Sequence, residues 1–424
     1  MNFAAIHIKN SHRRERLCES GPLSCLRRLD RGMKEIYNME GENKKEGIML
    51  MIYLDYSANT PTDNKVLRRF CEVTENDIGN ANSKHCAGMQ ALELQNQISS
   101  DIAEILHVLP EEIIYTSGAS ESNNLAIKGT ARTQRHIGKH IITTPLEHPS
   151  VSAPLTALQE QGYEIEMVNI GRDGKIDLEH FSSLLRKDTI LVTVSAVDSE
   201  LGTIQPVKEI SEILKDYPEC KLHLDATQAV GKIPVDFNIA DTISFAPHKF
   251  YGLNGSGLLI KRKSVILEPI IHGGSGTSIY RSGTPTLALN AAAETALVGA
   301  LQNREENYRK VQALNNILRE YFGKYDKVTI NSPENAVAHI LNLSVEGIKG
   351  TQFRDILSEH GICVSVKSAC SSDNLPSRAV FAVSRSRKNA LSSWRISLSH
   401  LTTEQEIEEF QKIFDQCCKE LAKK

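Results

Sequence analysis

Lys249 has the sequence context of a residue that does covalent chemistry. It follows the apolar run TISFA, is preceded by His248, and leads into the glycine-rich residues 251–257. A lysine at the end of a buried strand can lose its proton, because desolvation disfavours the ammonium form. The neutral amine can then form a Schiff base with a carbonyl group. Most lysines before such a turn are solvated charges, so Lys249 indicates a site only if partners accompany it.

Two polar residues in the segment LHLDATQAVG are suitable partners. Asp225 ends an apolar run, and a carboxylate buried there needs a partner of its own. A protonated pyridine nitrogen would serve, and the pairing would make a pyridoxal phosphate ring a stronger electron sink. Gln228 could reach the phenolic oxygen of the same ring. An aspartate that caps a helix is an equally good interpretation of this segment alone.

The segment TSGASESN, residues 116–123, lies between an expected strand and an expected helix. Gly118 permits a tight turn, and the first N–H groups of the helix, with the Ser120 hydroxyl, would form an anion site. An ordinary helix cap is the alternative.

His148 and Arg395 complete the set of candidate side chains. His148, in TTPLEHPSV, could stack on a cofactor ring and move protons; the alternative is a strand-end histidine bonded to backbone. Arg395, in SWRISLS, presents a fork-shaped donor that suits an amino-acid carboxylate. An internal salt bridge is the competing explanation.

Cys370 is the candidate nucleophile. It lies in VSVKSACSSDNLPSR, whose small and polar residues predict an exposed, mobile loop. Lys367 and Arg378 are near in sequence and would favour the thiolate. We therefore expect Cys370 to be reactive.

Elements that would position these residues follow from hydrophobic patterning. Short apolar runs predict strands over 113–116, 140–144, 165–168, 189–194, 221–224, 243–245 and 257–260. Amphipathic stretches predict helices over 122–132, 151–160, 178–185 and 207–214. Such alternation is typical of a mostly parallel sheet with helices on both faces, where ligands bind at the carboxyl ends of strands.

The pattern changes after about residue 291. A helical stretch over 291–323 precedes strands near 340–344, 363–366 and 394–397 and helices over 351–359 and 403–421. We expect an α/β fold with two domains. A large domain over 49–305 has a mostly parallel mixed sheet flanked by helices. A smaller α+β domain over 306–424 carries the cysteine loop, and residues 49–62 could pack with it.

Residues 1–48 lack this patterning and form a leader. Their arginines suit a transit peptide, although several acidic residues do not. We favour a mis-assigned start: residues 45–49 can be encoded by a bacterial ribosome-binding sequence before an ATG, so translation would begin at Met49 or Met51.

Composition limits the class of protein. The 424 residues are 40% hydrophobic and 24% charged with a net charge of -3, which gives no support to nucleic-acid binding. No apolar run is long enough to span a bilayer. Nine scattered cysteines do not form a disulfide framework, so we expect a reducing, cytoplasmic setting and no membrane contact.

Ordered motifs carry a family resemblance. From residue 52 to about 422 the chain contains, in order, YLDYSANTP, GNANSKH, TSGASESNNLAIKG, HIITTPLEH, DATQAVGK, HKFYG, HGG, YRSGT and SAC. In this order and spacing they resemble the NifS/IscS-like cysteine desulfurases, which are fold-type I pyridoxal-phosphate enzymes of the class V aminotransferase superfamily.

The resemblance implies a role for each candidate. Lys249 would hold pyridoxal phosphate, with Asp225 on the ring nitrogen, Gln228 on the ring oxygen and His148 stacked on the ring. Contacts to the phosphate would come from the Ala119 backbone, Ser120, His248 and, from a neighbouring subunit, Thr284. Asn80 and Arg395 would bind the substrate carboxylate. The Thr284 role implies a homodimer.

The reaction implied is the conversion of L-cysteine to L-alanine with a persulfide on Cys370. Lys249 and His148 would move protons, and the sulfur would pass to an unidentified acceptor in iron–sulfur assembly or thiolation. No resident metal is expected, although Cys370 could ligate a cluster transiently.

Three positions depart from the family pattern. Ser199 stands where asparagine is common and Ala246 where serine is common, so a ring-oxygen contact and a phosphate hydroxyl would be lost. Lys367 replaces a glycine before SAC. We expect no family-type tail for scaffold docking after the last helix, which would put a standard scaffold partnership in doubt. These departures keep two alternatives open, a related lyase acting on selenocysteine or cysteine sulfinate and a weakly active partner-binding homologue.

Overall fold

The computed structural model describes residues 51–274, 278–367 and 375–421. Its largest sheet has seven strands in the order β2 (Ile113–Thr116), β8 (Gly257–Lys261), β7 (Thr242–Phe245), β6 (Lys221–Asp225), β5 (Thr189–Ser195), β3 (His140–Thr143) and β4 (Glu164–Met167). The strand β8 runs antiparallel to both neighbours, and the other pairs are parallel. The predicted α/β fold with a mostly parallel mixed sheet is confirmed.

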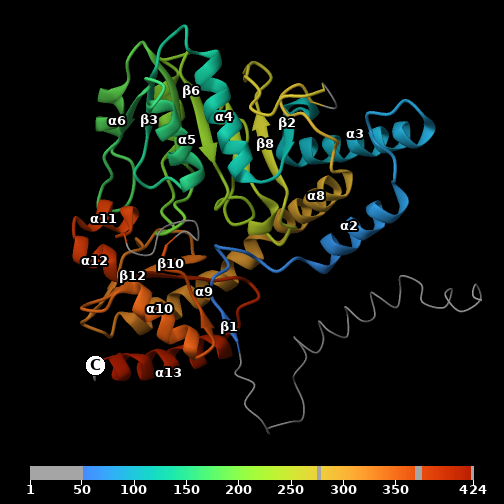
Figure 1. The fold of residues 1–424 in the computed structure, drawn as a ribbon. Helices are drawn as coiled ribbons and strands as arrows, with labels where there is room; N and C mark the ends of the chain where they lie inside the picture. The colour runs from blue at the N-terminus through green and yellow to red at the C-terminus, as the bar shows by residue number, and fades with distance from the viewer. Residues whose placement is uncertain (1–50, 275–277, 368–374, 422–424) are drawn as a thin grey trace, which may run out of the picture. The chain divides into compact units, whose positions relative to one another are not determined.

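Helices cover both faces of this sheet (Figure 1). On one face lie α4 (Ala119–Thr133) and α5 (Pro149–Gln159), which share an apolar cluster with Ile141 and Leu191. The next residue along each strand, Ile142 and Val192, belongs to the opposite cluster, because successive strand residues point to opposite faces. That second cluster includes side chains of α2 (Asn64–Asn76), α3 (Cys86–Leu106), α6 (Leu178–Leu184), α7 (Val207–Leu214) and α8 (Leu287–Gln302).

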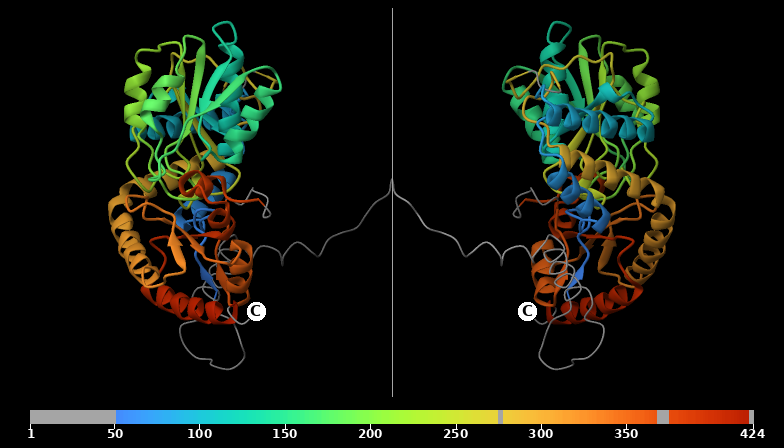
Figure 2. Two further views of the ribbon diagram at one scale, coloured as in Figure 1. Left: turned by 90° about the vertical axis from the view of Figure 1, so that its left-hand side faces the viewer. Right: turned by 90° about the vertical axis from the view of Figure 1, so that its right-hand side faces the viewer.

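A separate apolar cluster forms around the C-terminal elements. The strand β10 (Ile340–Val345) pairs antiparallel with β9 (Val328–Ile330) and β12 (Ser393–Ser397). The helices α9 (Arg304–Phe322), α10 (Gly350–Glu359) and α13 (Glu404–Leu421) pack in this cluster, whereas buried side chains of α11 (Arg378–Ser384) and α12 (Arg387–Ser392) belong to the second cluster of the large sheet. These orange and red elements lie together in the lower part of both views in Figure 2.

The first described strand, β1 (Ile52–Tyr53), joins the C-terminal elements. It pairs in parallel with β11 (Ile362–Cys363), and Ile52 and Leu54 are buried in the C-terminal apolar cluster. The short 3-10 turns η1 (Pro110–Glu112) and η2 (Pro247–Lys249) precede β2 and follow β7.

Several elements differ from the sequence-based expectation. The stretch 291–323 is two helices, α8 and α9, which meet at Asn303. The helices α2, α3, α11 and α12 were not predicted, and the strand expected over 363–366 is only Ile362–Cys363. None of the helices in the described ranges is long and apolar enough to cross a membrane. The leader, residues 1–48, lies outside these ranges.

Candidate active site

One cavity of about 350 Å³ gathers most of the predicted site residues. It lies where several strands of the large sheet end, and residues 57–58 and Arg395 line it from outside that sheet. The predicted residues that line it are Ala119, Ser120, His148, Ser199, Asp225, Gln228, His248, Lys249 and Arg395.

Lys249 lies in η2, directly after β7. Its Nζ donates hydrogen bonds to the backbone carbonyl oxygens of Ser57 (2.9 Å) and Ala58 (2.6 Å). The amine is thus held at the wall of the cavity by a segment nearly 200 residues away in sequence. The neighbouring His248 is neutral at physiological pH, since burial and the positive charges of Lys249 and Lys232 lower its pKa to about 4.

Asp225 is the last residue of β6, Gln228 lies three residues later, and both line the cavity. The Asp225 carboxylate is buried and accepts hydrogen bonds from Asn123 Nδ2 (2.8 Å) and the Thr227 backbone N–H (3.0 Å). Gln228 Nε2 donates to the Ser57 carbonyl (3.0 Å), and its Oε1 accepts from Lys232.

Sequence reasoning missed Lys232. It lies four residues after Gln228 in the motif DATQAVGK, and that spacing was the available signal. Burial lowers its pKa to about 7, and the nearby charges of Lys249 and Arg395 act in the same direction. Because the Ser57 carbonyl can only accept, the nitrogen of the Gln228 amide faces Ser57 and its oxygen faces Lys232.

The start of α4 offers free donors to an anion. Gly118 precedes the helix with φ 157°, and no described side chain caps the first N–H groups. Glu121 lies in this first turn, but Arg281 Nε and the Ser117 N–H both donate to it (3.0 and 2.8 Å). Burial acts to raise the pKa of Glu121, yet these hydrogen bonds lower it overall. The carboxylate is therefore paired, and the helix start remains suited to a phosphate.

Arg395 lines the cavity and also forms an ion pair. Its side chain is buried; Nη1 donates to the Ser199 carbonyl oxygen (2.6 Å) and Nη2 to Asp55 Oδ1 (2.9 Å). Asp55 belongs to the motif YLDYSANTP, and sequence reasoning did not single it out. A guanidinium has five N–H donors, so each terminal nitrogen keeps one N–H with which to bind a carboxylate.

Other predicted residues lie elsewhere. Asn80 is exposed, does not line the cavity, and its Oδ1 accepts from the Asn82 N–H (3.0 Å). Ala246 is fully buried behind the lining residues. Cys370 lies outside the described residues. At the edges of its segment, Lys367 Nζ donates to the Leu375 carbonyl.

A smaller cavity of about 290 Å³ adjoins the first. Lys367, Leu375 and Arg378 line it, and it shares His148 and Ser199 with the first cavity. The residues on both sides of the Cys370 segment therefore lie beside the candidate site.

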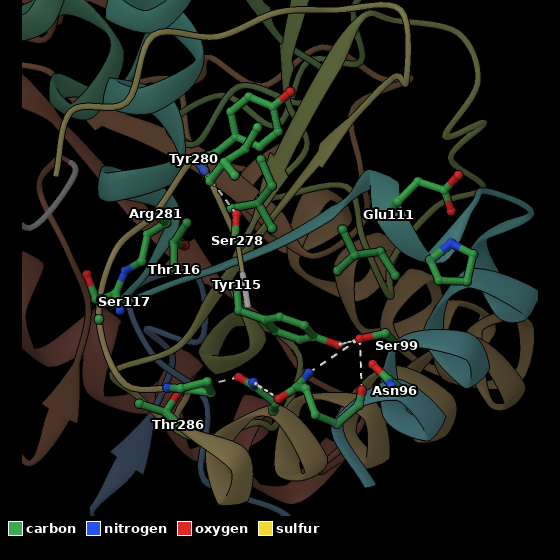
Figure 3. A pocket seen from close by; sticks show the side chains of 18 of the residues that line it. Asn96, Ser99, Glu111, Tyr115, Thr116, Ser117, Ser278, Tyr280, Arg281 and Thr286 are labelled. Carbon is green, nitrogen blue, oxygen red and sulfur yellow. Dashed lines mark hydrogen bonds between the residues drawn. The ribbon is translucent and has the colours of Figure 1, made fainter. Parts of the chain in front are cut away.

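Thr284 is exposed and lies in a different region, beside a cavity of about 720 Å³. Arg281, Gly283 and Thr286 line this cavity, which shares Ser117 with the candidate active site. Figure 3 shows side chains that line it, among them Tyr115, whose OH lies 3.0 Å from Ser99 Oγ.

Comparisons with known proteins agree with this geometry. Residues 52–410 match the family model described as aminotransferase class-V. A protein named "NifS/IcsS protein homolog" from Lactobacillus delbrueckii subsp. bulgaricus is 36% identical over 379 residues, 88% of this chain and 98% of that protein. A "Cysteine desulfurase IscS" from Neisseria meningitidis is 36% identical over 365 residues, 84% of this chain and 89% of that protein.

Solved structures give the same result. One titled "NIFS-LIKE PROTEIN" superposes with a TM-score of 0.82 at 32% identity, covering 87% of this chain and all of that one (100%). Another, "SspA in complex with cysteine", has a TM-score of 0.71 at 30% identity and covers 83% of this chain and 99% of that chain.

Proposed function

The chain belongs to the NifS/IscS cysteine desulfurase family of the class V aminotransferases, and we propose that it transfers the sulfur of L-cysteine to Cys370 and releases L-alanine. The observation that carries the proposal is the single cavity lined by Lys249, Asp225 and Arg395 together with the uncapped start of α4.

These residues fit pyridoxal phosphate group by group. The N–H groups at the start of α4 and the Ser120 hydroxyl suit its phosphate, and the buried Asp225 carboxylate suits a protonated ring nitrogen. Gln228 can donate to the ring oxygen, and Lys249 can bind the carbonyl carbon. When bound, the cofactor supplies an electron-withdrawing ring that stabilises negative charge on the substrate's α-carbon.

Each side chain has one task in the proposed reaction. Arg395 binds the carboxylate of L-cysteine through its remaining N–H donors. Lys249, once its amine is free, takes the proton from the α-carbon. Cys370 Sγ then bonds to the substrate sulfur while the carbon–sulfur bond breaks. The electron pair of that bond stays with the three-carbon product, which takes up one proton at its β-carbon, regains one at its α-carbon and leaves as L-alanine.

Ser199 and Ala246 weaken cofactor binding in this proposal without abolishing it. The Ser199 backbone still contacts Arg395, and Ala246 has no hydroxyl to give to a phosphate. Each missing hydrogen bond to a charged group costs about 1.5–3 kcal/mol. The donors of α4 and His248 offset part of that loss.

We also propose a homodimer. The exposed Thr284 and the large cavity beside it would face a second copy, whose Thr284 would reach the phosphate; Ile279, 69% exposed, lines the same cavity. A molar mass of one chain in light scattering would exclude this arrangement.

A reducing, cytoplasmic setting agrees with the free thiols of Cys71, Cys86, Cys220, Cys363, Cys417 and Cys418.

The test of the function is product analysis with L-cysteine. The protein loaded with pyridoxal phosphate is incubated with L-cysteine and a reductant, and alanine and sulfide are measured. Equal amounts of the two products are expected for the wild type, with loss of both in Cys370→Ala. Cys363→Ala, a thiol outside the cavity lining, is the matched control and should retain activity.

Alanine formed by Cys370→Ala at the wild-type rate would contradict the proposed nucleophile and favour a lyase that acts without it. If the loaded wild-type protein forms no alanine, the desulfurase function itself is wrong.

A further inference from the structure

The carboxamide of Asn123 makes four hydrogen bonds beneath the candidate active site. Asn123 lies in α4 and is completely buried. Its Nδ2 donates to Asp225 Oδ2 (2.8 Å) and to Ser150 Oγ (2.8 Å), and its Oδ1 accepts from Ser244 Oγ and lies 3.1 Å from His223 Nε2. An amide has two N–H donors and two acceptor lone pairs, so all four are used.

Asp225 determines which way this amide faces. An ionised carboxylate can only accept hydrogen bonds, so the nitrogen of the Asn123 amide must face it. His223 is consistent with this orientation. Burial lowers its pKa to about 4, and the neutral ring can donate from Nε2 to Asn123 Oδ1 while Nδ1 accepts from Thr242 Oγ1 (2.9 Å).

The orientation of the Asn123 amide also decides how the Ser150 hydroxyl bonds to His148. Because Ser150 Oγ accepts from Asn123, its own proton is available for His148 Nδ1, which lies 2.8 Å away. The Ser150 backbone N–H donates to the same nitrogen (3.1 Å). A ring nitrogen that accepts two donors carries no proton, so the proton of the neutral His148 ring lies on Nε2.

We infer that Ser150 and Asn123 are positioning residues that hold His148 as the neutral ring protonated at Nε2. The inference rests on the proposed function. In that function His148, which lines the cavity, donates a proton, and Lys249 is the base that takes the α-proton. Neither Ser150 nor Asn123 needs to touch the substrate for this role.

The charges around His148 are compatible with a neutral ring. Burial lowers its pKa; the Asp225 carboxylate opposes this, and Lys249 and Arg395 add to it. The hydrogen bonds from Ser150 stabilise the unprotonated Nδ1 and therefore act in the same direction as burial.

The inference is tested by measuring the pKa of His148 directly. Exchange of the histidine C2 proton for deuterium, followed against pH by peptide mass spectrometry, reports one residue at a time and needs no substrate. We expect the wild-type midpoint to lie below the ordinary histidine value. Ser150→Ala removes the hydroxyl donor, so its His148 midpoint should shift upward, and Ser150→Thr should restore the wild-type value.

Ser152→Ala is the matched control. It removes a hydroxyl from the same turn of α5, and Ser152 Oγ contacts Arg378 (3.3 Å) rather than His148. The acidic limb of the pH profile of alanine formation should move to higher pH in Ser150→Ala alone.

Two results separate this inference from the proposed function. If Ser150→Ala leaves the His148 midpoint unchanged, or if Ser152→Ala moves it equally, the positioning role is wrong even when the enzyme is active. If the midpoint shifts as expected but no variant or wild type forms alanine, the tautomer assignment stands and the desulfurase function fails.

Discussion

At the scale of single residues, chemistry-bearing types at strand ends were predictable, and their hydrogen-bond partners were not. Lys249, Asp225 and His148 each follow an apolar run, which is a local pattern. Asn123 and Asp55 contact Asp225 and Arg395 from 102 and 340 residues away. Such partners depend on how distant segments meet, which no local pattern specifies. Asn80, by contrast, shares a motif with the predicted site residues but does not line the cavity, and its role stays a prediction.

Asp198 allows a pH-dependent prediction. Its Oδ2 accepts from the Glu200 N–H (3.0 Å) and the Leu201 N–H, whereas Oδ1 has no hydrogen-bond partner among the described residues. Burial, with the charge of Glu200, raises its pKa from 3.8 to about 7. The folded state therefore binds the Asp198 proton more tightly than the unfolded chain does. As the pH rises from 3.8 to about 7, the free energy of unfolding falls because this stabilising contribution is lost.

Asp198→Asn cannot ionise, so the variant should be about as stable as wild type at pH 4 and more stable at pH 8. Urea unfolding at both pH values measures the difference. Glu147, whose pKa burial also raises to about 7, is present in both proteins and its contribution cancels. A stability difference that is the same at both pH values would refute the account of Asp198.

At the scale of elements, the strands of the large sheet were predicted closely because alternating β and α segments leave clear apolar runs, whereas the short strands β1 and β9 were not predicted. The division of residues 291–323 into α8 and α9 was missed, since Asn303 interrupts the helix without a proline or glycine. The helix α2 was missed as well, although its buried side chains include Val66 and Val73 at helical spacing. Helix boundaries that depend on packing between elements leave only a weak signal in the local sequence.

The contact between β8 and the start of α4 gives a prediction at this scale. A Cβ added to Gly257 would lie 2.4 Å from the backbone carbon of Gly118, so the two segments approach too closely for any side chain. Gly257→Ala should destabilise the protein by about 1–3 kcal/mol and weaken retention of pyridoxal phosphate, because Gly118 opens α4.

Gly299→Ala, inside α8, is the control for this prediction. Its added Cβ meets nothing within 4 Å, and alanine favours a helix, so stability should stay equal or rise by up to about 1 kcal/mol. Chemical unfolding and cofactor absorbance follow both variants. Unchanged cofactor retention in Gly257→Ala would contradict the proposed role of the α4 start.

At the scale of the whole described molecule, the candidate site depends on segments from both ends of the chain. The strand β1 pairs with β11, and the residues just after it supply the carbonyls that hold Lys249. Arg395 comes from β12, beside the buried Trp394 that stacks on Phe353. The sequence suggested that the first residues pack with the C-terminal elements. It could not indicate that the same segment forms a wall of the active site, because that requires the three-dimensional closure of the chain.

The measurement that tests the central claim most directly is the mass of the peptide that carries Cys370. The cofactor-loaded protein is mixed with L-cysteine without reductant, alkylated and digested. One additional sulfur atom on Cys370 is predicted for the wild type and none for Lys249→Ala, which keeps the thiol but lacks the amine. A wild-type Cys370 peptide without added sulfur, in a sample that nevertheless forms alanine, would contradict the account.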